Sequence, residues 1–120
     1  MKNALNWFEI PVLDVDRAVA CYEMLLGAKI KREVFGGMPY GVFPHEPPGV
    51  SGALVQDPKR PVGGGTLVYL NADGQLDAIL SRVSQAGATT LLPKTPIGKD
   101  GFIAIVVDTE GNRVGLNSST

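Results

Sequence analysis

Trp7-Phe8-Glu9-Ile10-Pro11-Val12 is a largely apolar run, and it opens a pattern that occurs twice in this chain of 120 residues. A stretch with the features of a capped amphipathic helix follows at residues 14–27, and a second apolar run follows at residues 28–34. The same series recurs half a chain later, at residues 66–70, 73–87 and 88–92. A repeated series of this kind predicts two copies of one folding unit.

Both predicted helices carry signals at their ends. In the first, Asp14 or Asp16 can accept hydrogen bonds from the unpaired N–H groups of the first turn, and Gly27 can adopt the left-handed conformation that ends a helix. Asp73 and Gly87 hold the corresponding positions in the second. Between these ends, apolar residues recur at spacings of three and four, which places them on one face. That face comprises Ala18, Val19, Tyr22, Leu25 and Leu26 in the first helix, and Leu76, Ile79, Leu80 and Val83 in the second.

The remaining apolar runs predict strands, separated by turns rich in glycine and proline. They lie at residues 29–35, 40–43 and 52–56 in the first half, and at residues 102–107 and 113–117 in the second. Each half therefore has the order βαβββ. The predicted fold is α+β, a single domain with module one at residues 1–57, a linker at residues 58–64 and module two at residues 65–120.

Charge and composition exclude several classes of partner. The formal net charge is −1 with both signs interspersed, which leaves no basic stripe for nucleic acid. No apolar run reaches the roughly 20 residues that span a bilayer, and no signal-peptide core precedes Trp7, so we expect a cytoplasmic protein without a membrane partner. Cys21 is the single cysteine, which excludes an intrachain disulfide and a thiolate metal cluster.

Several stretches carry a resemblance to a known family. Residues 8–18 (FEIPVLDVDRA), the following Cys21-Tyr22-Glu23 and Leu26-Gly27, and residues 108–114 (DTEGNRV) are similar to the vicinal oxygen chelate superfamily. That superfamily includes glyoxalase I, bleomycin-resistance proteins and extradiol dioxygenases. The resemblance implies two modules whose mixed sheets curl around a cavity. It also implies a homodimer, with the modules meeting either within one chain or across two.

That superfamily usually binds a divalent metal through four side chains, two from each module. The resemblance places these positions at Trp7, near Gly52, at Leu67 and at Gly115. None of the four side chains can ligate a metal, and the one histidine, His45, lies in a loop rich in proline and glycine. We therefore expect no metal and no other cofactor, and we expect neither glyoxalase nor dioxygenase activity.

Strand alternation predicts what lines the expected cavity, because residues two apart share a face. If the four positions above point inward, the same faces carry Glu9, Pro11, Leu54, Tyr69, Arg113 and Asn117. Trp7 and Tyr69 would offer stacking surfaces to a small organic ligand, and polar side chains could fix its orientation. Alternatively, the apolar residues simply fill the core. The candidate ligand-binding residues are Trp7, Leu54, Leu67, Tyr69, Arg113 and Asn117.

Glu9 is the one candidate catalytic residue. A carboxylate on an inward face must find a partner, take up a proton or stay hydrated. Glu9 could act as a general acid or base, or it could pair with Arg113 or a backbone group. The sequence thus leaves two hypotheses: a protein that binds a small hydrophobic or aromatic compound in a metal-free cavity, or a metal-independent lyase- or isomerase-like enzyme that uses Glu9.

Overall fold

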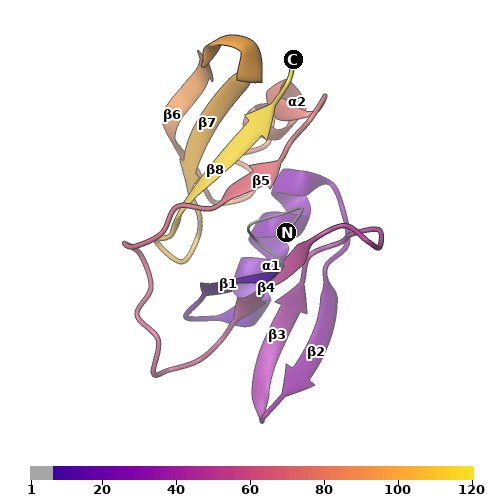
Figure 1. The fold of residues 1–120 in the computed structure, drawn as a ribbon. Coiled ribbons are helices and arrows are strands. Elements are labelled where there is room, and N and C mark those ends of the chain that lie inside the picture. Colours follow the sequence, from indigo (N-terminus) through magenta and orange to yellow (C-terminus); the bar gives the residue numbers. More distant parts are fainter. Residues whose placement is uncertain (1–6) are drawn as a thin grey trace.

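The computed structural model describes residues 7–120 as two modules, each with a four-stranded mixed sheet and one α-helix (Figure 1). The first module contains β1 (Trp7–Pro11), α1 (Val15–Leu26), β2 (Lys31–Phe35), β3 (Met38–Val42) and β4 (Ser51–Val55). The second contains β5 (Tyr69–Asn71), α2 (Leu76–Ser81), β6 (Thr89–Pro96), a short 3-10 helix η1 (Gly98–Asp100), β7 (Phe102–Val107) and β8 (Arg113–Ser118). The predicted α+β fold with two βαβββ modules is confirmed; the first six residues of the predicted module one lie outside the described residues.

The two sheets have the same strand order. Sheet A runs β1-β4-β3-β2, and sheet B runs β5-β8-β7-β6. In each sheet the first strand of the module lies parallel to the last, and the other pairs are antiparallel. β1 and β5 are therefore edge strands, and each keeps one side of its backbone free of a neighbouring strand of its own sheet.

The first helix forms where the sequence predicts it. Asp14 is the N-cap, and its carboxylate accepts a hydrogen bond from the backbone N–H of Arg17 at 3.1 Å. Gly27 ends the helix with a φ of 64°, and its N–H donates to the carbonyl of Glu23. A residue other than glycine would be strained in this left-handed conformation. α1 therefore has fixed ends.

The second helix is much shorter than predicted. α2 spans only Leu76–Ser81, whereas the apolar spacing predicted a helix over residues 73–87. The hydroxyl of Ser81 donates to a carbonyl three residues back at 2.6 Å, and beyond it the backbone continues as turns. Such side-chain bonds compete with the helical ladder. Asp73 is not the cap either, because its carboxylate accepts from the backbone N–H of Ser119 at 2.6 Å.

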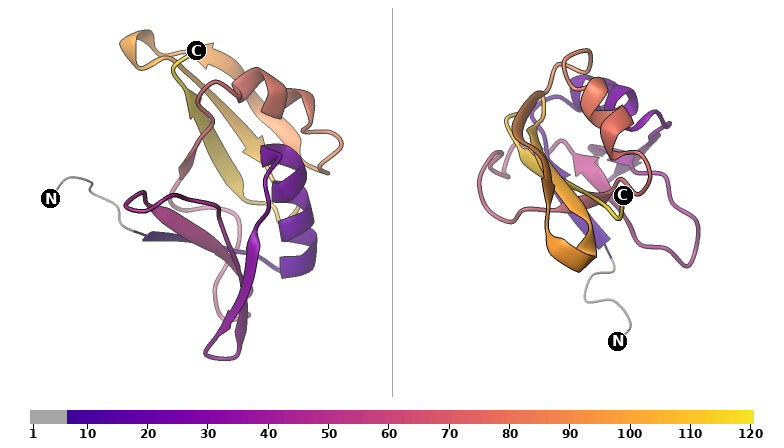
Figure 2. Two further views of the ribbon diagram at one scale, coloured as in Figure 1. Left: turned by 90° about the vertical axis from the view of Figure 1, so that its right-hand side faces the viewer. Right: turned by 90° about the horizontal axis from the view of Figure 1, so that it is seen from above.

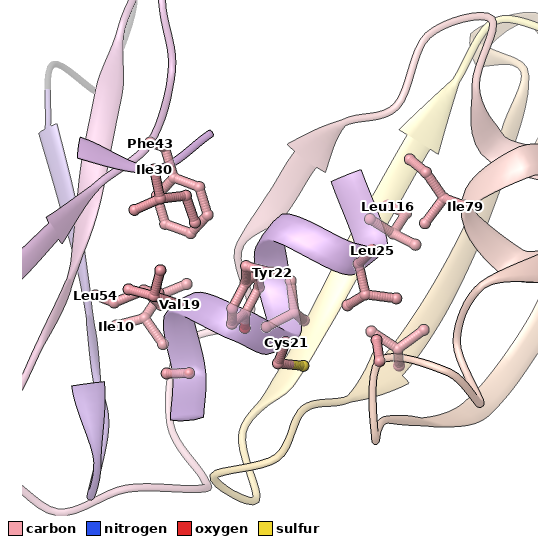
Figure 3. Packing of buried hydrophobic residues seen from close by; sticks show 14 of the residues in the cluster. Ile10, Val19, Cys21, Tyr22, Leu25, Ile30, Phe43, Leu54, Ile79 and Leu116 are labelled. Carbon is pink, nitrogen blue, oxygen red and sulfur yellow. The ribbon is translucent and has the colours of Figure 1, made fainter. Parts of the chain in front are cut away.

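α1 lies between the two sheets, and its buried side chains join both modules into one core (Figure 3). Val19 lies toward Ile10 and Leu54 of sheet A, whereas Leu25 lies toward Leu116 of sheet B. Figure 2 shows α1 and α2 next to each other on one side of the molecule. The helices thus cover one face of each sheet. We call the opposite faces, which point away from the helices, the outer faces.

A buried carboxylate of module two holds the start of α1. Glu110, in the loop between β7 and β8, is 4% exposed. Its carboxylate accepts hydrogen bonds from the backbone N–H groups of Leu13 and Asp14, both at 2.9 Å, and from the guanidinium of Arg17 at 2.7 and 2.9 Å. Burial opposes ionisation, but the hydrogen bonds from Arg17, Asp14 and Thr109 outweigh it and lower the pKa of Glu110 to about 2. We call this contact the Glu110 clamp.

Two other residues of the loop between β7 and β8, Asp108 and Asn112, also bind module one. The carboxylate of Asp108 accepts from the hydroxyl of Tyr22 at 2.7 Å and from the backbone N–H groups of Glu110 and Asn112, both at 2.8 Å. Asn112 in turn donates to the carbonyl of Pro11 at 2.7 Å. Burial and the nearby Asp108 carboxylate raise the pKa of Tyr22 well above its usual value, which keeps the phenol protonated as a donor. The loop is therefore tied to both β1 and α1.

Replacing Glu110 by Gln tests the clamp. The variant keeps an acceptor for the N–H groups but removes the charge that Arg17 pairs with. We expect the free energy of unfolding at pH 7 to fall by about 2 to 3 kcal/mol, less than the full pKa shift implies because Arg17 is half exposed to solvent. The measurement is urea denaturation followed by circular dichroism.

The difference in stability between wild type and Glu110→Gln should depend on pH. A carboxyl with a pKa of 4.5 when unfolded and about 2 when folded contributes stability above pH 4.5, and that contribution is lost as the pH falls toward 2. The difference between wild type and Glu110→Gln should therefore narrow below pH 4.5. Arg17→Gln, which leaves the backbone donors to Glu110 intact, should cost less. A Glu110→Gln effect below 0.5 kcal/mol at pH 7 would show that the clamp is not structural.

Candidate functional site

The outer faces of the two sheets carry most of the residues that the sequence singled out. In β1, Trp7, Glu9 and Pro11 alternate with the core residues Phe8 and Ile10. In sheet B, Tyr69 pairs with Gly115 and Asn71 pairs with Asn117, as same-face alternation predicted for Tyr69, Gly115 and Asn117. Trp7 is 40% exposed and Tyr69 is 44% exposed. Both aromatic rings are therefore available to a ligand.

The two sheets can be aligned through their parallel strand pairs. The backbone N–H that follows β1, from Val12, donates to the carbonyl of Val55, and the one that follows β5, from Ala72, donates to the carbonyl of Asn117. The two acceptors, Val55 and Asn117, therefore hold equivalent positions in the two sheets. The residues two positions before them, Ala53 and Gly115, are equivalent as well.

The second of the four metal positions therefore shifts by one residue, from Gly52 to Ala53. Gly52 faces the core instead, since an added Cβ there would lie 2.5 Å from the Phe8 ring. The four positions thus hold an indole, a methyl group, an isobutyl group and a hydrogen atom, at Trp7, Ala53, Leu67 and Gly115. Within residues 7–120 no group of three or more His, Cys, Asp or Glu side chains could hold a metal ion. The residues present do not fit the metal that the family resemblance implies.

Glu9 is held as a carboxylate by partners on both sides. The indole N–H of Trp7 donates to one oxygen at 3.1 Å, and the guanidinium of Arg60 binds the other. Arg60, which comes from the linker, also contacts Asp57 at 3.3 Å. Burial raises the pKa of Glu9, but the hydrogen bonds from Arg60 and Trp7 outweigh it, so the net shift is downward. The partner of Glu9 is Arg60, and not Arg113.

The outer face of sheet B contains a hollow of about 550 Å³, which we call the Tyr69 hollow. Its lining consists of apolar side chains, one aromatic ring and two carboxamides, from Tyr69, Leu70, Asn71, Ile97, Ile103 and Asn117. An added Cβ at Gly115 would lie 2.3 Å from the Tyr69 ring, so only glycine allows the ring to lie against the strand at this point. The sequence thus sets the position of the aromatic wall.

A second hollow, of about 350 Å³, lies along the free edge of β1, and we call it the Trp7 hollow. Residues 7–11, which make up β1, form one side. The other side comes from the segment that leads into β5 and from the start of β8 with the residue before it, and it consists of Gly63, Gly64, Thr66, Val68, Asn112, Arg113 and Val114. This hollow exists because the loop between β7 and β8 is tied to β1 through Asn112.

The structure brings the predicted site residues together in two groups instead of one. Trp7, Glu9 and Arg113 line the Trp7 hollow, and Tyr69 and Asn117 line the Tyr69 hollow. Leu67 lies just before β5 and is 36% exposed.

Leu54 does not share the outer face. It pairs with Ile10 and is fully buried in the core against α1, so the prediction of its face was wrong. The error follows from taking Gly52 as the inward position of β4, since a shift of one residue exchanges the two faces of a strand.

Four lining or anchoring residues were missed by sequence reasoning. Asn71 lies two residues after Tyr69 on the same face, so strand alternation could have found it. Ile103 pairs with Asn117 across β7 and β8, and Ile97 follows β6. Arg60 lies in the linker, where no periodicity predicts which way a side chain points.

Comparison with known proteins places this geometry in a family. The model of the Glyoxalase/Bleomycin resistance protein/Dioxygenase superfamily matches residues 4–116. A glyoxalase/bleomycin resistance protein/dioxygenase family enzyme from Burkholderia phytofirmans PsJN superposes with a TM-score of 0.71 at 14% identity, over 96% of this chain and 98% of that chain. A glyoxalase/bleomycin resistance protein from Albidiferax ferrireducens T118 gives a TM-score of 0.71 at 19% identity, over 97% and 98% of the two chains.

A glyoxalase I mutant from Zea mays is also similar, with a TM-score of 0.70 at 18% identity over 96% of this chain and 46% of that chain. At these identities the likeness shows the fold. No curated protein matches the sequence. Of the helices described in residues 7–120, none has the length and apolar character needed to cross a bilayer.

The four metal positions lead to a prediction of metal content. Because Trp7, Ala53, Leu67 and Gly115 offer no nitrogen, oxygen or sulfur side-chain ligand, we expect the purified protein to contain no stoichiometric zinc, nickel, iron or manganese. Elemental analysis after purification without chelator measures this. About one such ion per chain, retained through dialysis, would overturn the prediction.

Proposed function

Because the chain belongs to the glyoxalase/bleomycin resistance protein/dioxygenase superfamily, we propose that it binds a small hydrophobic or aromatic compound, without a metal, in the Tyr69 hollow. The observation that carries this proposal is an exposed aromatic ring held over a glycine, at the wall of a hollow of about 550 Å³. Small-molecule sites typically have volumes of about 300 to 1,000 Å³ and apolar walls with few polar groups.

The lining fits a flat, largely apolar ligand. Tyr69 offers one ring face for stacking, and Ile97 and Ile103 offer aliphatic surface. The Asn71 carboxamide oxygen accepts from the backbone N–H of Asp73, which leaves the amide nitrogen as a donor for a ligand. The Asn117 amide nitrogen donates to the carbonyl of Phe102, which leaves its oxygen as an acceptor. A ligand could thus be oriented by one donor and one acceptor.

Binding is favoured over acid–base catalysis by the chemistry of the two hollows. Apart from the Tyr69 phenol, no residue that lines the Tyr69 hollow has an ionisable side chain. Glu9 lines the other hollow, and its pKa is lowered by partners that occupy both carboxylate oxygens. A general base works best with a pKa near the working pH. These features support sequestration of a compound and give no support to an enzyme that uses Glu9.

The proposal includes a two-fold homodimer. The outer faces are uncovered by the helices, and they carry exposed apolar side chains, including Trp7, Phe35, Tyr69 and Ile97. In a dimer with an isologous interface, the outer face of sheet A in one copy would cover the outer face of sheet B in the other. We also propose a cytoplasmic location, which the single buried cysteine fits.

Tyr69→Ala tests the binding site. We expect the neutral fluorescent probe N-phenyl-1-naphthylamine to bind the wild type in a saturable way, and the variant to bind it more weakly by about 1 to 3 kcal/mol, the scale of a lost aromatic contact. Fluorescence titration measures both affinities. Leu13→Ala, which removes an exposed apolar side chain outside both hollows, is the control and should bind as the wild type does. Equal affinity in Tyr69→Ala and wild type would refute the site.

Light scattering tests the dimer separately. We expect a mass of twice the 12.7 kDa chain at micromolar concentration, because two outer faces with exposed aromatic residues are costly to leave in water. A monomer that persists at several hundred micromolar would contradict the dimer. The Tyr69 hollow would then remain an open site on one chain.

A further inference from the structure

We infer that the Trp7 hollow is a second binding site, specific for a flat aromatic carboxylate, with the Arg113 guanidinium binding the carboxylate and the Trp7 indole stacking on the ring. This site differs from the Tyr69 hollow in position, lining and charge. The inference therefore does not depend on the compound proposed for the Tyr69 hollow.

The indole of Trp7 is fixed in place although it is partly exposed. Its ring N–H donates to Glu9 at 3.1 Å, and Glu9 is held on its other side by Arg60. The ring is 40% exposed and lines the hollow. A ring that is already oriented loses little conformational freedom when a ligand stacks on it. Trp7 is thus a preorganised stacking surface.

Most polar groups that line the hollow are already paired. The amide nitrogen of Asn112 donates to the carbonyl of Pro11, and its oxygen accepts from the backbone N–H of Gly63, both at 2.7 Å. Glu9 accepts from Trp7 and Arg60. The side chains of Asn112 and Glu9 therefore already have hydrogen-bond partners within the protein.

Arg113 is the charged lining residue that has no ion-pair partner among the described residues. Among residues 7–120, no carboxylate lies within 4.0 Å of its guanidinium, whereas Arg60 neutralises Glu9 in the same hollow. Arg60 also pairs with Asp57, so the four charged groups Glu9, Asp57, Arg60 and Arg113 sum to zero, and Arg113 is the one of them without an ion-pair partner among residues 7–120. The hydroxyl of Thr66 adds a neutral donor to the lining. An unpaired guanidinium in the lining favours an anion over a neutral or cationic ligand.

The planar shape of the Arg113 guanidinium favours a carboxylate as the anion. A guanidinium is planar and presents parallel N–H groups that match the two oxygens of a carboxylate. Trp7 provides a flat face in the same hollow, and Pro11 and Val114 add apolar surface. A ligand that satisfies all of these groups has an aromatic ring with a carboxylate attached to it. The volume of about 350 Å³ fits a compound of that size.

The test uses three compounds of nearly equal shape and different charge. Trp7 is the only tryptophan, so its fluorescence reports on this hollow alone. Nitroaromatic rings quench indole fluorescence on contact, so saturable quenching measures binding. We expect 4-nitrobenzoate to bind at least ten-fold more tightly than neutral 4-nitrobenzamide, and 4-nitrobenzylamine to bind most weakly. Equal affinity for the benzoate and the benzamide would overturn the inference without any variant.

Substitution of Arg113 tests whether its guanidinium causes the preference for the carboxylate. Arg113→Gln should lower the affinity for 4-nitrobenzoate to that for 4-nitrobenzamide, and Arg113→Lys should keep part of the preference as a point charge without the planar fork. Arg32→Gln removes an exposed cation that pairs with Asp16, away from the hollow, and should keep the full preference. A ten-fold preference that survives in Arg113→Gln would show that Arg113 does not bind the carboxylate.

Discussion

The Glu110 clamp is the contact on which the arrangement of the two modules depends. A carboxylate that is 4% exposed would destabilise the fold if it were unpaired, and here it caps the backbone of α1 and binds Arg17 across the module boundary. The same loop ties Asp108 to Tyr22 in the core and Asn112 to β1. Because these bonds lie at one end of α1, they fix how sheet B sits against the first module.

That arrangement decides where a ligand can bind. With α1 between the sheets, the core uses one face of each sheet and leaves the outer faces to carry the candidate sites. On these faces, the positions that would hold a metal are occupied by Trp7, Ala53, Leu67 and Gly115. The glycine is what allows the Tyr69 ring to lie against the strand. At Gly115 the absence of a side chain therefore leaves one metal position without a ligand and also makes room for the aromatic wall.

The sequence was informative where local chemistry determines structure. The cap at Asp14, the stop at Gly27 and the shared face of Tyr69, Gly115 and Asn117 follow from rules that act over a few residues. Leu54 was placed on the wrong face because Gly52, one residue before Ala53, was taken as the metal position of β4. Strand alternation assigns faces only relative to such a starting residue, so it could not reveal the error.

The partners of Glu9 and Glu110 could not be predicted in the same way. Arg60 lies 51 residues from Glu9, and Arg17 lies 93 residues from Glu110. The division of the site into two hollows likewise depends on how the modules pack together, a feature that no local pattern encodes. The proposed site, in which a small hydrophobic or aromatic compound binds the outer face of sheet B without a metal, depends on this packing.

Amide NMR spectra recorded with 2-naphthol, in the presence of chelator, would locate the binding site residue by residue. We expect saturable shifts concentrated on Tyr69, Asn71, Ile103 and Asn117. Shifts spread over the surface, or binding that appears only after a divalent metal is added, would rule out this metal-free site.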